Sequence, residues 1–134
     1  MLKVLVADDS KFMQAAYKKV LESEKNFQVV ATVSDGQEAV CQSQALRPHV
    51  VILDIRMPNV GGIEAARQIS AVQPGIGIVI ISACEDSQPL VDLLNIDARG
   101  KAYIRKTSLD DIGALIRAVE GVARGETILR PELS

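Results

Sequence analysis

The sequence is poor in aromatic residues and in the residues that bind zinc or form disulfides. It has no Trp, two Phe, two Tyr, two Cys and one His in 134 residues. So few Cys and His provide neither a disulfide framework nor a zinc site. Cys41 and Cys84 are therefore expected to be two reduced thiols, and His49 is expected to begin a strand without a chemical role. The core has to be built from aliphatic side chains.

Long apolar runs and an excess of basic charge are also missing. No run approaches the roughly 20 residues of a transmembrane helix, and a first strand starting at Leu2 leaves no room for a signal peptide. The formal net charge is −2 without a basic cluster, whereas a nucleic-acid surface needs concentrated positive charge. We therefore expect a cytoplasmic domain that contacts neither a membrane nor nucleic acid directly.

Short apolar runs alternate with segments of helical periodicity along the whole chain. Hydrophobic residues make up 48% of the sequence and charged residues 24%, which is typical of one folded domain. Strands are expected at residues 2–7, 27–33, 50–53, 76–81 and 101–105. Each precedes a predicted helix, so the pattern predicts an α/β fold with a five-stranded parallel sheet. A doubly wound, flavodoxin-like strand order 2-1-3-4-5 fits best.

The first helix is expected from Lys11, with Phe12, Met13, Tyr17 and Leu21 among the residues of one apolar face. Further helices are expected from Gly36 to about residue 46, over residues 63–72, from the segment 87–89 onward, and after a capping box at residues 108–111. We predict that the domain covers residues 1–124. Residues 125–134 are predicted to be a tail or the start of a linker to an output domain that this chain lacks.

Polar residues follow four of the predicted strands where each one ends: Asp8 and Asp9, Asp54, Ser82, and Lys106. The carboxyl ends of parallel strands form the edge where open α/β sheets bind ligands. A single Asp at such a place is most often a helix cap or a turn residue. If all five residues were only cap or turn residues, their places at corresponding strand ends would be five independent coincidences. One shared site is the better interpretation.

The chemistry of that site is expected to involve phosphate and a divalent cation. Three carboxylates close together raise each other's pKa unless a cation joins them, and Lys106 supplies only one positive charge. An all-oxygen site suits Mg²⁺, with Mn²⁺ as a substitute. Asp54 would then attack a phosphoryl group in line, with Ser82 donating a hydrogen bond to it. Tyr103 by its spacing alone is a packing residue.

These residues resemble the receiver domain of bacterial two-component response regulators. The pair Asp8-Asp9, then Asp54 followed by Met57-Pro58 and Gly62, then Ser82-Ala83, then Lys106 have that family's order and spacing. The resemblance covers residues 1–124. It implies a signalling domain that takes a phosphoryl group from a sensor histidine kinase, and not an enzyme acting on other substrates.

The resemblance also implies a role for each matching residue. Asp54 matches the phosphoacceptor and Lys106 the lysine that pairs with the phosphoryl group. The metal ligands would be Asp9 directly, Asp8 through water, Asp54, and the backbone carbonyl of Arg56. Ser82 and Tyr103 match the switch hydroxyl and the switch aromatic, whose movement would change the face formed by the fourth helix, fifth strand and fifth helix.

Two segments, residues 97–106 and 124–131, resemble the NarL/FixJ-type subfamily of response regulators. In that subfamily a LuxR-type helix-turn-helix domain normally follows. The chain would then be the regulatory part of a transcriptional regulator, which reaches DNA only through an output domain and which can form a homodimer. Arg56 and Cys84 lie two residues beyond the acceptor and the switch hydroxyl, so we expect them to influence the lifetime of the phosphate.

Two other functions share part of this pattern. A phosphatase of the haloacid-dehalogenase type also uses an Asp nucleophile with Mg²⁺, but it needs a second Asp two residues later, where this chain has Arg56. A nucleotide or flavin binder needs a glycine-rich loop after the first strand. Asp8 and Asp9 occupy that loop.

Overall fold

The computed structural model describes residues 1–83, 88–96, 99–105 and 112–130. Within these residues no helix is both long and apolar enough to cross a bilayer. The elements in chain order are β1 (Leu2–Ala7), α1 (Lys11–Glu22), β2 (Phe27–Val33), α2 (Gly36–Leu46), β3 (Val50–Asp54), α3 (Gly62–Val72), β4 (Gly77–Ser82), α4 (Gln88–Leu94), β5 (Lys101–Arg105), α5 (Ile112–Ala123) and β6 (Ile128–Arg130).

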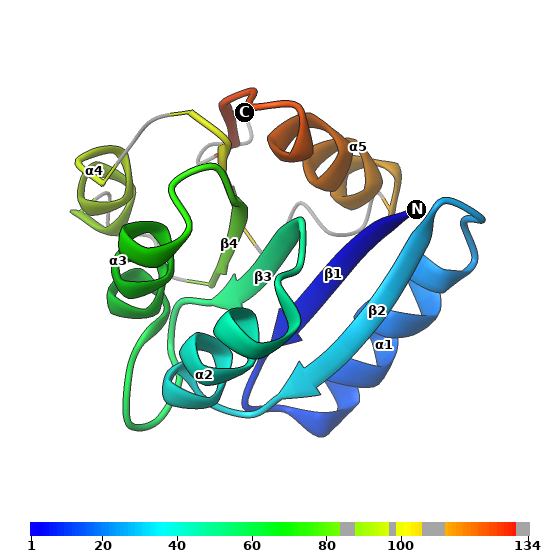
Figure 1. Ribbon diagram of the computed structural model, residues 1–134, viewed down its shortest axis with the longest axis horizontal. Coiled ribbons are helices and arrows are strands. Elements are labelled where there is room, and N and C mark those ends of the chain that lie inside the picture. Colours follow the sequence, from blue (N-terminus) through cyan, green and yellow to red (C-terminus); the bar gives the residue numbers. More distant parts are fainter. Residues whose placement is uncertain (84–87, 97–98, 106–111, 131–134) are drawn as a thin grey trace.

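The strands form one parallel sheet in the order β2-β1-β3-β4-β5-β6 (Figure 1). The predicted order of the first five strands and the flavodoxin-like fold are confirmed. Most predicted boundaries agree to within one residue. The differences that can be checked are of one residue each: β3 ends one residue later than predicted, β4 begins and ends one residue later, and α3 begins one residue earlier. The predicted helix starts at residues 87 and 108–111 lie outside the described residues.

A sixth strand, β6, lies within the segment that was predicted to be a tail or linker. It pairs with β5 from Ala102↔Ile128 to Ile104↔Arg130. Gly125, with a φ of 87°, turns the chain after α5, and its carbonyl accepts a hydrogen bond from Gly100 N at 3.1 Å. Three residues are too few to produce a strand pattern in the sequence. Pairing with the edge of β5 therefore creates this strand.

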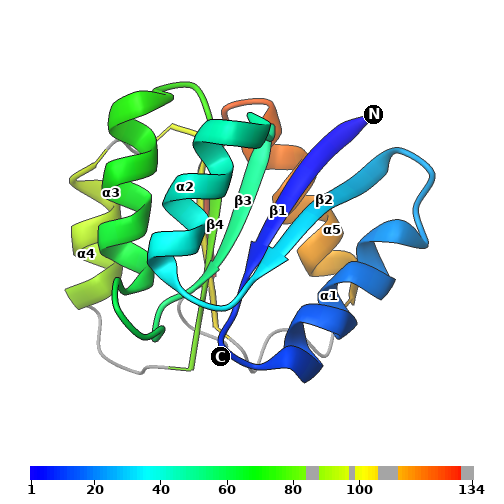
Figure 2. The same ribbon diagram turned by 60° about the horizontal axis from the view of Figure 1, so that its bottom comes forward.

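Two layers of helices cover the sheet (Figure 2). Helices α1 and α5 lie on one face, and α2, α3 and α4 lie on the other. Because successive residues of a strand point to opposite faces, the central strands supply both cores. Val50 and Ile52 belong to the core beneath α1 and α5, whereas Val51 and Leu53 belong to the other. Burial on both faces explains why these strands are continuous apolar runs.

The helix starts have local causes in the sequence. Ser10 is the N-cap of α1, and its hydroxyl accepts a hydrogen bond from Met13 N at 3.2 Å. Asp35 is the N-cap of α2, where its carboxylate accepts from Glu38 N at 2.8 Å. The Glu38 carboxylate in turn accepts from Ser34 N at 3.1 Å. This reciprocal arrangement is a capping box, displaced by one residue.

The apolar face predicted for α1 is wrong at Phe12, and the polar residue Gln14, for which the sequence made no prediction, is buried. Phe12 was expected on the buried face but is 79% exposed, and Gln14 is 4% exposed. The helix turns so that Tyr17 and Leu21 face the sheet, which carries Phe12 outward at the start of the helix. Gln14 is buried because backbone carbonyls surround its amide, a pattern that hydropathy does not encode.

Candidate functional site

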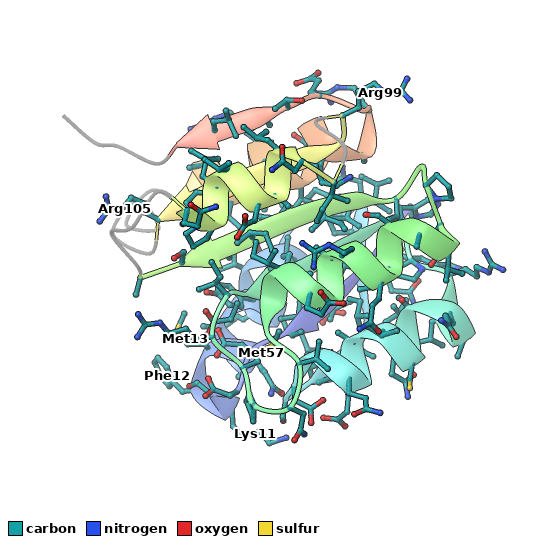
Figure 3. The ribbon with its side chains drawn as sticks, turned by 90° about the vertical axis from the view of Figure 1, so that its left-hand side faces the viewer. Lys11, Phe12, Met13, Met57, Arg99 and Arg105 are labelled. Atoms are coloured by element: carbon teal, nitrogen blue, oxygen red, sulfur yellow. The ribbon has the colours of Figure 1, made fainter. Side chains whose placement is uncertain are left out.

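The site lies at the edge of the sheet where β1, β3, β4 and β5 end. The last register pairs include Ala7↔Leu53, Asp54↔Ile81 and Ser82↔Arg105. Figure 3 shows this end of the molecule through the labelled side chains of Lys11, Phe12, Met13, Met57 and Arg105, with Arg99 at the opposite end. Asp8, Asp9, Asp54 and Ser82 therefore lie at one edge of the sheet, whereas Tyr103 lies further back within β5.

Three carboxylates converge there. One oxygen from each of Asp8, Asp9 and Asp54 lies within 4.8 Å of the others. Asp8 is fully buried, Asp54 is 6% exposed, and Asp9 is exposed to solvent. The register accounts for the closeness of two of them. Because Ala7 pairs with Leu53, the next residues along the two strands are Asp8 and Asp54.

None of the three carboxylates caps a described helix. The N-cap of α1 is Ser10, and the N-cap of α3 is Gly61, which has no side chain to cap with. Asp8 does shape the turn after β1, because its Oδ1 accepts a hydrogen bond from Ser10 N at 2.9 Å. The helix-cap interpretation therefore fails for the cluster, and a shared site accounts for it better.

Gln14 fixes the backbone at Asp8. Its Nε2 donates to Asp8 O at 2.7 Å, to Val33 O at 3.0 Å and to Ser34 Oγ at 3.1 Å. Asp8 N also donates to Val33 O at 3.1 Å. These bonds join the ends of β1 and β2 beneath the cluster. Gln14 was not predicted from the sequence, where its only signal is its place six residues after a strand-end Asp.

The loop after Asp54 is held by close packing against two glycines. A Cβ on Gly62 would lie 2.4 Å from the carbonyl oxygen of Asp54, and a Cβ on Gly36 would lie 2.0 Å from that of Val60. Asn59, at a φ of 68°, donates from Nδ2 to Asp35 Oδ2 at 2.8 Å. Glycine at these two contacts lets α2 and α3 approach the loop and fix its path.

The remaining predicted residues are distributed as follows. Ser82 ends β4 and is fully buried, and Tyr103 in β5 is 2% exposed. Tyr103 belongs to the core beneath α3 and α4, on the face that Ile78, Ile80 and then Ser82 share by alternation. Arg56 is exposed in the loop after β3. Lys106 and Cys84 lie outside the described residues.

The charge of the cluster acts on a buried tyrosine that sequence reasoning treated only as packing. Burial raises the pKa of the Tyr17 hydroxyl above its usual range, and the negative charges of Asp8 and Asp54 raise this pKa further. The phenol therefore stays protonated at neutral pH. A half-buried acid near the same edge behaves in the opposite way, because the hydrogen bond from Glu38 N lowers the pKa of Asp35.

The donor set fits a hard divalent cation. The cluster offers carboxylate oxygens only, and two of the three side chains are buried. Oxygen ligands with one or two carboxylates plus water are what Mg²⁺ uses in proteins, while zinc prefers nitrogen and sulfur. Asp8, Asp9 and Asp54 could hold such an ion.

Comparison with known proteins settles the family. The model of the response regulator receiver domain matches residues 4–120. The chain belongs to this family. Its acid cluster lies at the carboxyl edge of a receiver-domain sheet, as the sequence resemblance implied.

Individual relatives of this receiver domain carry different output functions in their names. The transcriptional regulatory protein DegU of Brevibacillus brevis is 32% identical over 99% of this chain and 55% of its own length. A protein-glutamate methylesterase/protein-glutamine glutaminase of Geobacter metallireducens is 38% identical over 90% of this chain and 35% of its own. The chain thus spans about a third to just over half of these two proteins.

A solved structure supports the same conclusion. The signal receiver domain of NarL from Mycobacterium tuberculosis superposes with a TM-score of 0.84 and 25% identity, covering 93% of this chain and 98% of that one. This receiver domain therefore has the fold of a NarL-type relative, in agreement with the subfamily resemblance of its sequence.

Proposed function

We propose that this receiver domain accepts a phosphoryl group on Asp54 and passes the change to an output partner. The observation that carries the proposal is the acid cluster, in which oxygens of Asp8, Asp9 and Asp54 come within 4.8 Å of one another at the strand ends. Asp54 is the last residue of β3 and is almost fully buried. Its backbone is held by the close approach of Gly62.

We propose the roles of the residues from the family resemblance, which the acid cluster at the strand ends supports. Asp54 attacks the phosphorus of a sensor kinase's phosphohistidine. The phosphorus–nitrogen bond breaks with its electron pair left on the imidazole, and a phosphorus–oxygen bond to Asp54 forms. Asp8, Asp9, Asp54 and the backbone carbonyl of Arg56 would hold Mg²⁺, which when bound would supply positive charge to offset the negative charge of the phosphoryl oxygens. Lys106 supplies a second positive charge.

The output step involves the face of the sheet that α2, α3 and α4 cover, opposite to the face of α1 and α5. Ser82 and Tyr103 lie on the side covered by α3 and α4, so a hydrogen bond between Ser82 and the phosphoryl group would draw the end of β4 towards Asp54. The ring of Tyr103 is already buried, so its inward position is sterically possible in this fold. We propose that phosphorylation changes how firmly that position is held, and thereby the surface of α4, β5 and α5.

The attached function is proposed from the relatives. DegU is named a transcriptional regulatory protein. We propose that this chain regulates a DNA-binding output domain, through homodimer formation at the changed surface. The methylesterase relative makes a catalytic output the second candidate.

The test is Mg²⁺-dependent phosphorylation by acetyl phosphate, followed by intact mass. The wild-type protein should gain one phosphoryl group, and chelation of divalent cations should abolish the gain. Asp54→Asn, which keeps the shape of the side chain, should not be modified. Asp92→Asn is the matched control, because Asp92 lies on α4 and accepts a hydrogen bond from Gln88 Nε2 at 2.8 Å. Unchanged labelling of Asp54→Asn would disprove the assignment.

A further inference from the structure

Tyr17 places a polar group beneath the acid cluster that the proposed roles do not use. The side chain is 4% exposed and belongs to the core between α1 and the sheet. Its hydroxyl is buried, and among the residues that the structure describes it makes no hydrogen bond. Buried hydroxyls almost always have a partner, so an orphaned one beside charged groups calls for a physical explanation.

The direction of the side chain brings the hydroxyl towards the carboxylates. Side chains of a helix tilt towards its N-terminus, and α1 begins at Lys11, directly after the strand-end acids. Val6 and Ile52 share the core of Tyr17. By the alternation of the strands, Asp8 and Asp54 are the next residues on that same face. The electrostatic effect of both carboxylates on Tyr17 agrees with this placement.

We propose that the Tyr17 hydroxyl is a positioning donor for the cation site, and that it hydrogen-bonds the Asp8 carboxylate from the core side, directly or through one water, once a divalent cation is bound. This inference rests on the proposed function, since it concerns the same cluster. Asp8 is favoured over Asp54 because it has the larger electrostatic effect on Tyr17 and is fully buried. Asp54 is also less suitable as the acceptor, because its carboxylate is the group that is to be phosphorylated.

A phenol suits this role better than a charged donor would. A protonated hydroxyl can orient a carboxylate without neutralising it, so the attraction between Asp8 and the cation is kept. Donors that hydrogen-bond a metal-ligating group orient it, and their removal typically weakens metal affinity by about 10–100-fold. The proposal therefore predicts a loss of affinity for Mg²⁺ in Tyr17→Phe, which keeps the buried ring and removes only the oxygen.

The experiment is calorimetric titration of the intact protein with Mg²⁺ alone. Tyr17→Phe should bind Mg²⁺ about 10-fold more weakly than wild type, and its rate of labelling by acetyl phosphate should return to the wild-type rate at saturating Mg²⁺. Ser70→Ala is the control, since it also removes a buried hydroxyl that lacks a hydrogen bond among the described residues. Ser70 lies near the end of α3, away from the strand-end acids, and Ser70→Ala should keep the wild-type affinity.

A second measurement does not depend on the variant folding. In wild-type protein with ¹³C-labelled tyrosine, the Cζ resonance of Tyr17 should shift during the Mg²⁺ titration as its hydroxyl gains a partner. Equal affinities of wild type and Tyr17→Phe, or a Tyr17 resonance that does not move while Mg²⁺ binds, would overturn the inference. Failure of the wild type to bind Mg²⁺ would instead overturn the proposed function.

Discussion

Replacing Gln14 with Met tests whether one buried amide holds the Asp8 backbone in place. The substitution keeps an unbranched side chain of similar size and removes the donor of three hydrogen bonds, to Asp8 O, Val33 O and Ser34 Oγ. Because Nε2 carries two hydrogens, at least one of them is shared between acceptors. The three acceptors are not equally affected by its loss.

The expected magnitude follows from what each acceptor has left. Val33 O still accepts the hydrogen bond from Asp8 N at 3.1 Å. Ser34 is half-buried and can turn to water. Asp8 O belongs to a fully buried residue and loses the 2.7 Å bond from Gln14. Removing the donor of a buried hydrogen bond costs about 1–3 kcal/mol, so we expect Gln14→Met to lower the free energy of unfolding by about 2 kcal/mol.

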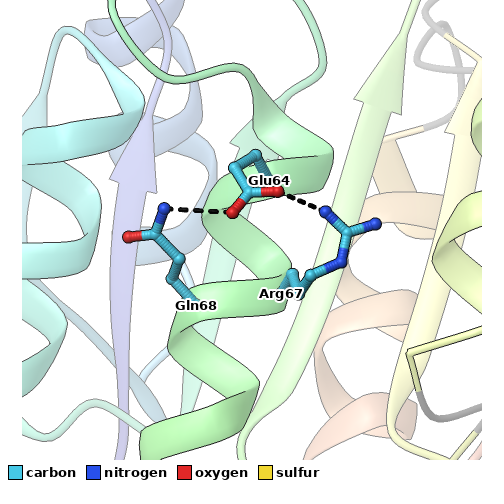
Figure 4. Close-up of polar contacts among 3 residues, drawn as sticks. All are labelled: Glu64, Arg67 and Gln68. Carbon is cyan, nitrogen blue, oxygen red and sulfur yellow. Dashed lines mark hydrogen bonds and ion pairs between the residues drawn. The ribbon is translucent and has the colours of Figure 1, made fainter.

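Urea unfolding at neutral pH measures this difference, and α3 offers a matched control (Figure 4). Gln68 Nε2 donates to Glu64 Oε2 at 3.1 Å, and Arg67 pairs with the other oxygen of Glu64. All three side chains are exposed or half-exposed. Gln68→Met should therefore change stability by less than about 0.5 kcal/mol. A Gln14→Met protein as stable as Gln68→Met would refute the reasoning.

Two further predictions concern the loops around the site. Gly36→Ala should destabilise the protein by about 1–3 kcal/mol or more, because the new Cβ overlaps the backbone of Val60. Gly75→Ala is the control, since its Cβ meets nothing within 4 Å, and its stability should stay within about 1 kcal/mol of wild type. Equal effects of the two substitutions in urea unfolding would contradict this prediction. The pKa of Asp35 is lowered in the folded state, so its charge stabilises the fold above the unfolded pKa and this contribution is lost as pH falls through the folded pKa. The stability advantage of wild type over Asp35→Asn should therefore be present at pH 6 and shrink in acid, and a constant difference would argue against the linkage.

Much of the fold could be predicted from local pattern because the signals are strong. β3 is a continuous apolar run that burial on both faces requires, and Asp35-Gly36 marks the start of α2 by side-chain capping. The five parallel strands follow from the alternation of runs. β6 could not be predicted in this way, since its three residues become a strand only by pairing with β5.

The candidate site likewise has a part that the sequence predicts and a part that depends on tertiary contacts. The residue types at the strand ends suggested a cation and a phosphoryl group, and the cluster of Asp8, Asp9 and Asp54 agrees with that suggestion. The contacts of Gln14 and the role proposed for Tyr17 were missed, because both depend on which atoms surround the side chain. An amide or a phenol on a helix has no periodic signature that separates packing from positioning.

Local sequence pattern was enough to predict the alternation of strands and helices, the parallel sheet, and the acids where strands end. These features depend on interactions within a few residues or on the burial of whole runs. Three contacts became visible only in the folded protein: Ser10, not an acid, caps α1, Gln14 joins Asp8 to β2, and Tyr17 lies in the core close enough to Asp8 and Asp54 to feel their charge. Such contacts join residues of different elements, and they exist only once the packed sheet has brought those elements together.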